Sequence, residues 1–156
     1  MAFQTIHLML QNSGMPFRLH DHVPVRTYED ALTRVPHLTR NLIKTIVFKI
    51  KDSHWILAGV SGSDRINYKL LGQAFHVNRK LIRAVSPDQV EKELGFEIGG
   101  TGPFPVNQNV RVILDERLME LGTVFCGSGK NTRTVEMSVI DLARLVQAKI
   151  RPIRKD

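Results

Sequence analysis

The chain has 156 residues, of which 42% are hydrophobic, and 22 basic against 15 acidic residues give it a formal net charge of +7. That length suits one domain with a real core, and no apolar run is long enough to cross a membrane. The amino terminus lacks the features of a secretory signal, and a single cysteine, Cys126, excludes an internal disulfide. We therefore expect a cytoplasmic protein. The positive charge favours a polyanionic partner such as nucleic acid, although charge also simply keeps small proteins soluble.

Three short elements are predicted at the amino-terminal end. Apolar residues at helical spacing over residues 3–12 predict an amphipathic helix that ends at Gly14. Residues 17–23 alternate as a strand does. Thr27 is expected to cap a helix, because acidic residues follow it in the first turn, and Pro36 should end that helix.

A lysine within an apolar strand is the most informative feature of the chain. Residues 42–50 and 54–61 predict the two strands of a hairpin, joined by the turn 51–53. Alternation places Lys44 on one face with Leu42, Ile46, Phe48 and Ile50. An ammonium group there must reach water, a counter-charge or a ligand, because burying it unpaired is costly or shifts its pKa.

The second half of the chain continues with short elements. A helix is expected at 67–75, a strand at 80–85, and a helix from the cap Ser86 to Gly95. The remaining predicted elements are strands at 110–114, 124–126 and 132–137, a brief helix at 116–121, and a last helix capped by Ser138. Short strands interleaved with short helices indicate an α+β fold in a single domain over residues 1–156. The basic stretch 149–155 could be a solvated tail.

Two glycine-rich turns lie between predicted elements, at 99–103 and 127–129. Glycine allows bare backbone N–H groups to approach a bound molecule closely. Together with Lys44, the first turn suits a small site for an anionic or ester-bearing ligand. The second turn is not a phosphate-binding loop, because Val124 stands where that motif needs a glycine and Asn131 replaces its Ser or Thr.

Other chemistries find little support. His20 and His22 share a strand face, as a metal pair could, but no acidic or cysteine partner has metal-site spacing, so a structural or surface role is favoured. We expect no metal and no cofactor. Cys126 is interpreted as a small core residue, because a nucleophile would need a neighbouring base that a sequence cannot show. The chain also lacks the Gly-x-Ser-x-Gly elbow of serine hydrolases.

Two residues carry alternatives. Asp141, three residues after Ser138, can complete a capping box in its own helix, or its carboxylate can orient a catalytic or substrate group. Tyr28 can be half-buried packing or the wall of a pocket.

Several stretches in order resemble one family. These are Lys44-Thr45 at the entry of an apolar strand, residues 95–104, residues 112–116, and the stretch from Val124 through Gly129-Lys130 to Asp141-Leu142. They resemble the YbaK-type domains, which are related to the editing domain inserted in bacterial prolyl-tRNA synthetase. The resemblance extends from His20 to the basic carboxyl terminus. It implies a mixed, mostly antiparallel sheet or open barrel with short peripheral helices.

The resemblance also implies an activity and a set of site residues. Such proteins are aminoacyl-tRNA deacylases, which hydrolyse the ester between a wrongly attached amino acid and the terminal adenosine of tRNA, typically a tRNA for proline. On this resemblance the catalytic residues are Lys44, Gly99, Gly100 and Asp141. The substrate-binding residues are His20, Tyr28, Thr45, Thr101, Gly102, Pro103, Gly127, Ser128 and Gly129. The implied partners are aminoacylated tRNA and prolyl-tRNA synthetase.

The implied chemistry suits these residues. An aminoacyl ester is already activated, so backbone amides of Gly99 and Gly100 could steady the oxyanion while Lys44 positions the substrate. The family commonly has Ser-Pro-Phe-Gly where this chain has Gly102-Pro103-Phe104-Pro105. Asn131-Thr132 resembles the branch that clears alanine, and Thr45 the branch associated with cysteine, so the amino acid is left open. Two further alternatives are a non-catalytic binder of tRNA or of a synthetase, and a general small-ligand domain.

Overall fold

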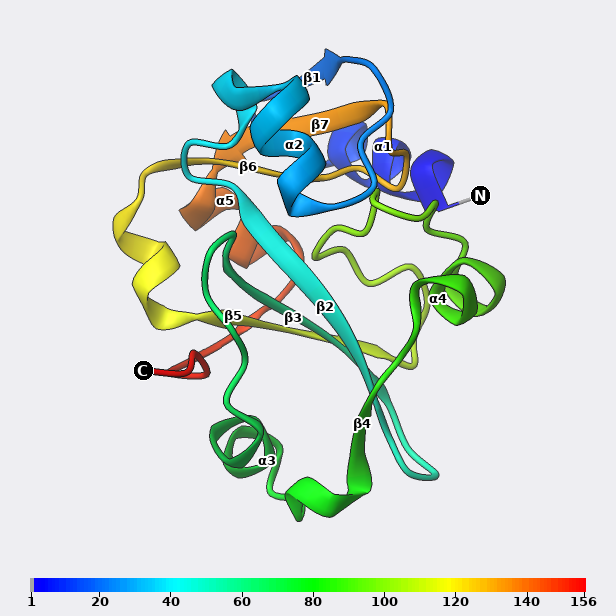
Figure 1. The fold of residues 1–156 in the computed structure, drawn as a ribbon, viewed down its shortest axis with the longest axis vertical. Helices are drawn as coiled ribbons and strands as arrows, with labels where there is room; N and C mark the ends of the chain where they lie inside the picture. The colour runs from blue at the N-terminus through cyan, green and yellow to red at the C-terminus, as the bar shows by residue number, and fades with distance from the viewer. Residues whose placement is uncertain (1) are drawn as a thin grey trace.

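The strands of the protein form two sheets with short helices around them (Figure 1), in a computed structural model that describes residues 2–156. The helices are α1 Ala2–Ser13, α2 Tyr28–Arg34, α3 Tyr68–Phe75, α4 Pro87–Leu94 and α5 Val139–Leu145, with 3-10 turns η1 Pro36–Leu38, η2 Arg79–Leu81 and η3 Glu116–Glu120. The strands are β1 Phe17–Asp21, β2 Ile43–Ile50, β3 Trp55–Ser61, β4 Ile82–Ala84, β5 Val110–Asp115, β6 Thr123–Gly127, β7 Arg133–Ser138 and β8 Lys149–Arg151.

The two sheets differ in their strand directions. The smaller has the order β1-β7-β6 and is antiparallel throughout. The larger has the order β4-β2-β3-β5-β8, in which β2 pairs antiparallel with β3 and β4 while β5 pairs parallel with β3 and β8. An isolated bridge between Leu42 and Phe125 joins the sheets. The predicted α+β class with a mixed, mostly antiparallel arrangement is confirmed, with the strands divided between two sheets.

The predicted helix starts are confirmed by their caps. The hydroxyl groups of Thr27, Ser86 and Ser138 each accept a hydrogen bond from a backbone N–H in the first turn of the following helix. Such a cap contributes about 1 kcal/mol. At the other ends, α1 is followed by Gly14 at φ +72° and α4 by Gly95 at φ +82°, backbone conformations that glycine adopts without strain.

The structure departs from the sequence prediction in three places. The predicted strand 80–85 divides into η2 and the three-residue β4, and the brief helix at 116–121 is the 3-10 turn η3. The basic carboxyl-terminal stretch is not a solvated tail, because β8 pairs with β5 and Ile153 is fully buried. A three-residue edge strand leaves too short an alternation to detect from sequence.

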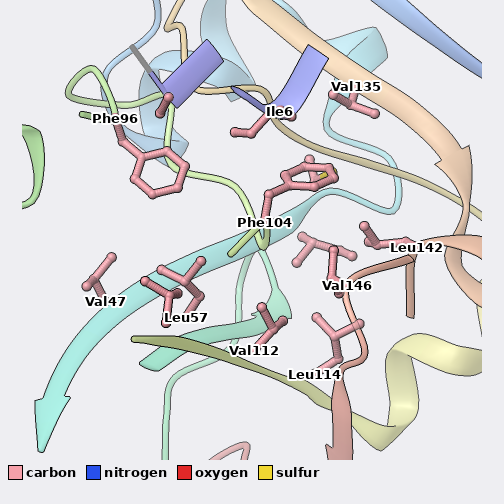
Figure 2. Packing of buried hydrophobic residues seen from close by; sticks show 14 of the residues in the cluster. Ile6, Val47, Leu57, Phe96, Phe104, Val112, Leu114, Val135, Leu142 and Val146 are labelled. Carbon is pink, nitrogen blue, oxygen red and sulfur yellow. The ribbon is translucent and has the colours of Figure 1, made fainter. Parts of the chain in front are cut away.

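Buried side chains pack on both faces of the larger sheet. One cluster contains Val47, Leu57 and Leu114 together with residues of α1 and α5 (Figure 2), and the other contains Phe48 and Leu71 of α3. Each fully buried side chain of this size contributes roughly 1.5–3 kcal/mol. No helix among residues 2–156 has the length and apolar character that a membrane crossing requires.

The core also fixes the first glycine-rich turn. Phe96 and Phe104, which flank it, are both 0% exposed and lie in the same cluster (Figure 2). The turn is therefore held at both ends, and its backbone has a defined position.

Candidate functional site

A cavity of about 330 Å³ lies between the amino-terminal half of β2, helix α2 and the two glycine-rich turns, a volume suited to a small ligand. Its apolar wall is formed by Val25, Ala31, Val35, Leu38, Leu42, Ile43, Ile46, Val47, Val85, Pro87, Val90, Ile98 and Cys126. The rest of the wall is formed by His22, Arg26, Thr27, Tyr28, Lys44, Thr45, Gly99, Thr101, Gly127, Lys130, Arg133 and Thr134.

Lys44 borders this cavity from β2, and its ammonium group has a defined hydrogen bond. Nζ donates to the backbone carbonyl oxygen of Asp64 at 2.5 Å. Burial lowers the pKa of Lys44 by removing water, the carboxylates of Asp64 and Glu29 act in the opposite direction, and Arg65 lowers it further. Because an ammonium group has three donors, the bond to Asp64 leaves two for a ligand.

Thr45 and Tyr28 also line the cavity. Oγ1 of Thr45 is buried and has no hydrogen-bond partner among residues 2–156. A buried hydroxyl without a partner is unfavourable, so a ligand that could bond to it would gain from doing so. The ring of Tyr28 packs directly on Gly62, where a side chain would overlap it, so Tyr28 is also a packing residue.

The first glycine-rich turn contributes Gly99 and Thr101 to the cavity wall. Neither of their amides donates to another residue in the described part of the chain. The N–H of Gly100 is not available to a ligand, because it donates to the carbonyl of Glu97 at 2.8 Å. Gly99 and Gly100 were the expected pair of oxyanion donors, but the amide of Gly100 is occupied and Gly100 lies outside the wall. The amides of this turn that remain without an acceptor in the described part of the chain, on residues at the wall, are those of Gly99 and Thr101.

The rest of that turn packs against the second turn. A side chain on Gly102 would overlap the backbone of Gly127, and Pro103 does not border the cavity. Gly127 reaches the wall. Gly102 and Pro103 thus shape the loop from outside the wall.

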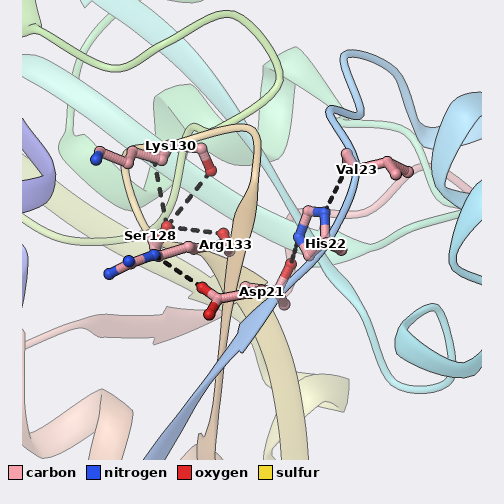
Figure 3. Close-up of polar contacts among 7 residues, drawn as sticks. Asp21, His22, Val23, Ser128, Lys130 and Arg133 are labelled. Atoms are coloured by element: carbon pink, nitrogen blue, oxygen red, sulfur yellow. Dashed lines mark hydrogen bonds and ion pairs between the residues drawn. The ribbon is translucent and has the colours of Figure 1, made fainter.

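In the second turn, Ser128 has a structural environment (Figure 3). It is 0% exposed, and its hydroxyl donates to the carbonyl of Arg133 at 2.7 Å and accepts from the N–H of Lys130 at 3.3 Å. Gly129, at φ +101°, packs on the backbone of Phe3. Neither Ser128 nor Gly129 borders the cavity.

The two histidines of the first strand region have different positions. His20 lies outside the wall, where its Nε2 is 2.6 Å from a carboxylate oxygen of Glu136. His22 lines the cavity, and its Nδ1 is 2.7 Å from the carbonyl of Val23 (Figure 3) while its Nε2 is 2.8 Å from Oγ1 of Thr134. Since a carbonyl only accepts, Nδ1 carries a hydrogen, and in the neutral ring Nε2 accepts from the Thr134 hydroxyl.

Asp141 and Cys126 have structural surroundings. The N–H of Asp141 donates to Oγ of Ser138 at 3.3 Å in the first turn of α5, and the residue does not border the cavity. This bond is made by the main chain of Asp141, so it confirms Ser138 as the cap and leaves both interpretations of the Asp141 carboxylate open. Cys126 is fully buried, which raises its pKa to about 12, so it has little thiolate character, in agreement with its predicted place in the core.

Positive side chains surround the cavity more densely than the sequence indicated. Besides Lys44, the wall includes Arg26, Lys130 and Arg133. Lys130 and Arg133 lie over the ring of Phe3, at 4.9 Å and 5.1 Å from its centroid. Arg133 also pairs with Asp21, Nε to Oδ1 at 2.9 Å (Figure 3).

The cavity therefore gathers part of the predicted set. Its wall includes Lys44, Tyr28, Thr45, Gly99, Thr101 and Gly127, and excludes Gly100, Gly102, Pro103, Ser128, Gly129, His20 and Asp141. Sequence reasoning missed His22, Arg26, Lys130, Arg133 and Thr134. The one available signal was the proximity of Lys130 and Arg133 to the second glycine turn in sequence. Nothing in their spacing showed that they share a cavity with Lys44.

Comparisons with known proteins point to one family. A family model described as an aminoacyl-tRNA editing domain matches residues 22–145. Protein YwhH of Bacillus subtilis, which is uncharacterized, is 27% identical over 124 residues, covering 80% of this chain and 77% of its own. A proline–tRNA ligase of Streptococcus equi subsp. equi is 24% identical over 106 residues, which cover 68% of this chain and 17% of the ligase.

The fold itself also occurs in a solved structure. A crystal structure of a protein proposed as a trans-editing enzyme for prolyl tRNA synthetase superposes with a TM-score of 0.82 at 21% identity, covering 99% of this chain and 98% of that one. The agreement in fold supports the arrangement of sheets described above. With a family model that spans most of its length, the chain belongs to the family of aminoacyl-tRNA editing domains.

Proposed function

We propose that the protein is an aminoacyl-tRNA deacylase that hydrolyses the ester of a mischarged tRNA for proline. The observation that carries this proposal is the composition of one cavity wall, in which Lys44 and the amides of Gly99 and Thr101 lie beside an apolar surface. The apolar surface suits the side chain of a small amino acid, and the amides and Lys44 can donate to its ester carbonyl and to the neighbouring phosphate of the tRNA.

In the proposed reaction, water attacks the carbonyl carbon of the aminoacyl ester. The bond between that carbon and the terminal ribose oxygen breaks, the ribose oxygen takes a proton, and the products are a free amino acid and tRNA. The amides of Gly99 and Thr101 would bond to the oxyanion that forms on the carbonyl oxygen. One such donor contributes about 3 kcal/mol to the transition state.

No side chain in the wall is an evident general base for the water. His22 is held between Val23 and Thr134, and the carboxylate of Asp141 does not border the cavity. The 2′-hydroxyl of the terminal adenosine could orient the water, so the proposed reaction needs no protein nucleophile and no metal. Lys44 would then position the substrate through the phosphate of the terminal nucleotide.

The charges around the cavity support tRNA as the partner. Arg26, Lys130 and Arg133 form a positive rim on which a phosphate backbone can rest. Prolyl-tRNA synthetase, the source of the mischarged product, is the second proposed partner, and the cytoplasm is the proposed place of action. The amino acid is proposed to be cysteine or alanine.

The proposal is tested by incubating purified protein with cysteinyl- and alanyl-tRNA for proline and following loss of the ester. We expect repeated turnover for the wild type and little hydrolysis by Lys44→Ala. Lys51→Ala, in the exposed β2–β3 turn, is the matched control and should behave as wild type. Equal ester loss with wild type and with Lys44→Ala would contradict the proposal.

The number of turnovers distinguishes the alternative of a non-catalytic binder. A binder would protect one equivalent of mischarged tRNA and release no amino acid, even with substrate in excess. A general small-ligand domain would bind tRNA no more tightly than other basic proteins do, and its affinity would not depend on Arg26 or Lys130.

A further inference from the structure

The carboxyl-terminal segment, residues 152–156, packs on the loop between β3 and α3. A carbonyl of this loop, that of Asp64, accepts the hydrogen bond from Nζ of Lys44. The N–H of Asn67 donates to the carbonyl of Ile153 at 2.8 Å, and the N–H of Lys155 donates to the carbonyl of Arg65 at 2.7 Å. An isolated bridge pairs Ile66 with Arg154. The loop between β3 and α3 is thus attached along its length to the end of the chain.

A buried carboxylate anchors this segment. Asp115 is 2% exposed, and its Oδ1 accepts from the backbone N–H groups of Ile153 at 2.9 Å and Arg154 at 3.2 Å. Its Oδ2 accepts from the N–H of Arg117 at 3.2 Å. A buried carboxylate that is bonded on both oxygens holds its partners firmly, because releasing any of them would leave charge without a donor.

Asp64 connects this segment to the cavity. Its backbone carbonyl accepts from Nζ of Lys44, and its carboxylate Oδ2 lies 3.6 Å from Nη1 of Arg154. Both side chains of that ion pair are about a quarter exposed, at 25% for Arg154 and 24% for Asp64. Contacts therefore run without interruption from Asp115 through Arg154 and Asp64 to Lys44.

We propose that Arg154 and Asp64 are positioning residues, which fix the ammonium group of Lys44 at the cavity wall. This inference rests on the proposed function of Lys44. With one donor of Lys44 held on the Asp64 carbonyl, the other two are directed rather than free to rotate. The end of the chain, outside the matched family region 22–145, thereby takes part in building the site.

The charges around Lys44 give the inference a readout that does not depend on activity. The groups that act on it are Asp64 and Glu29, which raise its pKa, and Arg65, which lowers it, while burial is the largest cause of the lowered pKa. Releasing the loop would let water reach the ammonium group. Arg154 acts on Lys44 through Asp64, so its replacement should free the loop and raise the pKa of Lys44 toward its ordinary value of 10.5.

The experiment compares Arg154→Gln with Arg151→Gln in the full chain. Arg151 is exposed on β8, and its Nη1 bonds only to the carbonyl of its neighbour Ile150 among the described residues, which makes it a control on the same segment. The pKa of Lys44 is measured from the chemical shift of its labelled side chain during a pH titration. We expect a rise in Arg154→Gln, no change in Arg151→Gln, and return to the wild-type value in Arg154→Lys.

Deacylation measured on the same variants gives a second result. We expect kcat/KM to fall about tenfold in Arg154→Gln and to recover in Arg154→Lys, since a misplaced positioning group costs up to about 10²-fold. An unchanged Lys44 pKa and unchanged kcat/KM in Arg154→Gln would overturn the inference. If the pKa rises but the wild type hydrolyses no ester, the positioning stands and the proposed function fails.

Discussion

Gly102 and Gly127 meet backbone to backbone, so that a Cβ atom on either would overlap the main chain of the other turn. Each turn therefore supports the other, and together they hold Gly99, Thr101 and Gly127 at the cavity wall. Close packing explains why both positions are glycine, and Gly127, unlike Gly102, also borders the cavity.

Gly102→Ala should destabilise the protein strongly, because the obstacle is backbone and cannot move aside. We expect a loss of roughly 1–3 kcal/mol in the free energy of unfolding, measured by denaturant titration. Gly122→Ala is the control, since a Cβ there meets nothing within 4 Å, although its φ of +78° carries a strain of about 1 kcal/mol. A smaller loss for Gly102→Ala than for Gly122→Ala would contradict the packing argument.

Thr45→Val should leave stability unchanged or raise it by about 1 kcal/mol, because it replaces a buried hydroxyl that has no partner among residues 2–156. Thr134→Val should instead lower stability, since the hydroxyl of Thr134 bonds to Nε2 of His22 at 2.8 Å. Thermal unfolding of the two variants measures the difference. If Thr45→Val is the less stable of the pair, the hydroxyl of Thr45 forms a stabilising bond in solution and the prediction is wrong.

The lowered pKa of Lys44 predicts a pH dependence of stability. Between the lowered pKa and 10.5, the unfolded chain binds more protons at this lysine than the folded protein does. The contribution of Lys44 to stability is thus lowest below its folded pKa and increases as the pH rises toward 10.5.

This dependence is measured against Lys44→Met, which cannot titrate. As the pH rises from the lowered pKa of Lys44 to 10.5, the unfolding free energy of the wild type should increase relative to that of Lys44→Met. Above 10.5 the difference should become constant. A difference that stays constant between the lowered pKa and 10.5 would show that burial does not disfavour the charged lysine.

The positive rim of the cavity should contribute to tRNA binding through phosphates. Replacing Arg26 or Lys130 with glutamine should weaken affinity for uncharged tRNA and reduce the log–log salt slope by roughly 0.7–0.9 for each phosphate that is no longer neutralised. Arg117→Gln, exposed on η3, removes the same charge at a position that does not border the cavity. Equal slopes for the rim variants and this control would place the RNA elsewhere.

Asp141→Asn separates the two interpretations of that residue. A side chain that does not border the cavity should change kcat/KM by less than about twofold, whereas loss of a catalytic carboxylate costs about 10²-fold or more. Ser138→Ala should lower stability by about 1 kcal/mol, because it removes the hydroxyl that caps α5. Deacylation assays and thermal unfolding measure the two effects.

The sequence by itself was enough to determine much of the local structure, apart from the short elements η2, β4, η3 and β8. Helix caps at Thr27, Ser86 and Ser138, the β2–β3 hairpin and the place of Lys44 on an apolar strand face all follow from spacing and from single-residue chemistry. These signals are local, because a cap or an alternation involves residues only a few positions apart. The family resemblance then identified candidate site residues that lie far apart in sequence, which no local pattern could have assigned to one site.

Only the tertiary structure decided which side chains meet. His22, and not His20, reaches the cavity because β1 ends at Asp21, and beyond that point alternation no longer sets direction. The amide of Gly100 is occupied by Glu97, and the end of the chain lies against the loop that holds Lys44. Each of these outcomes depends on how backbone segments far apart in sequence pack and pair, and no periodicity within one segment encodes that pairing.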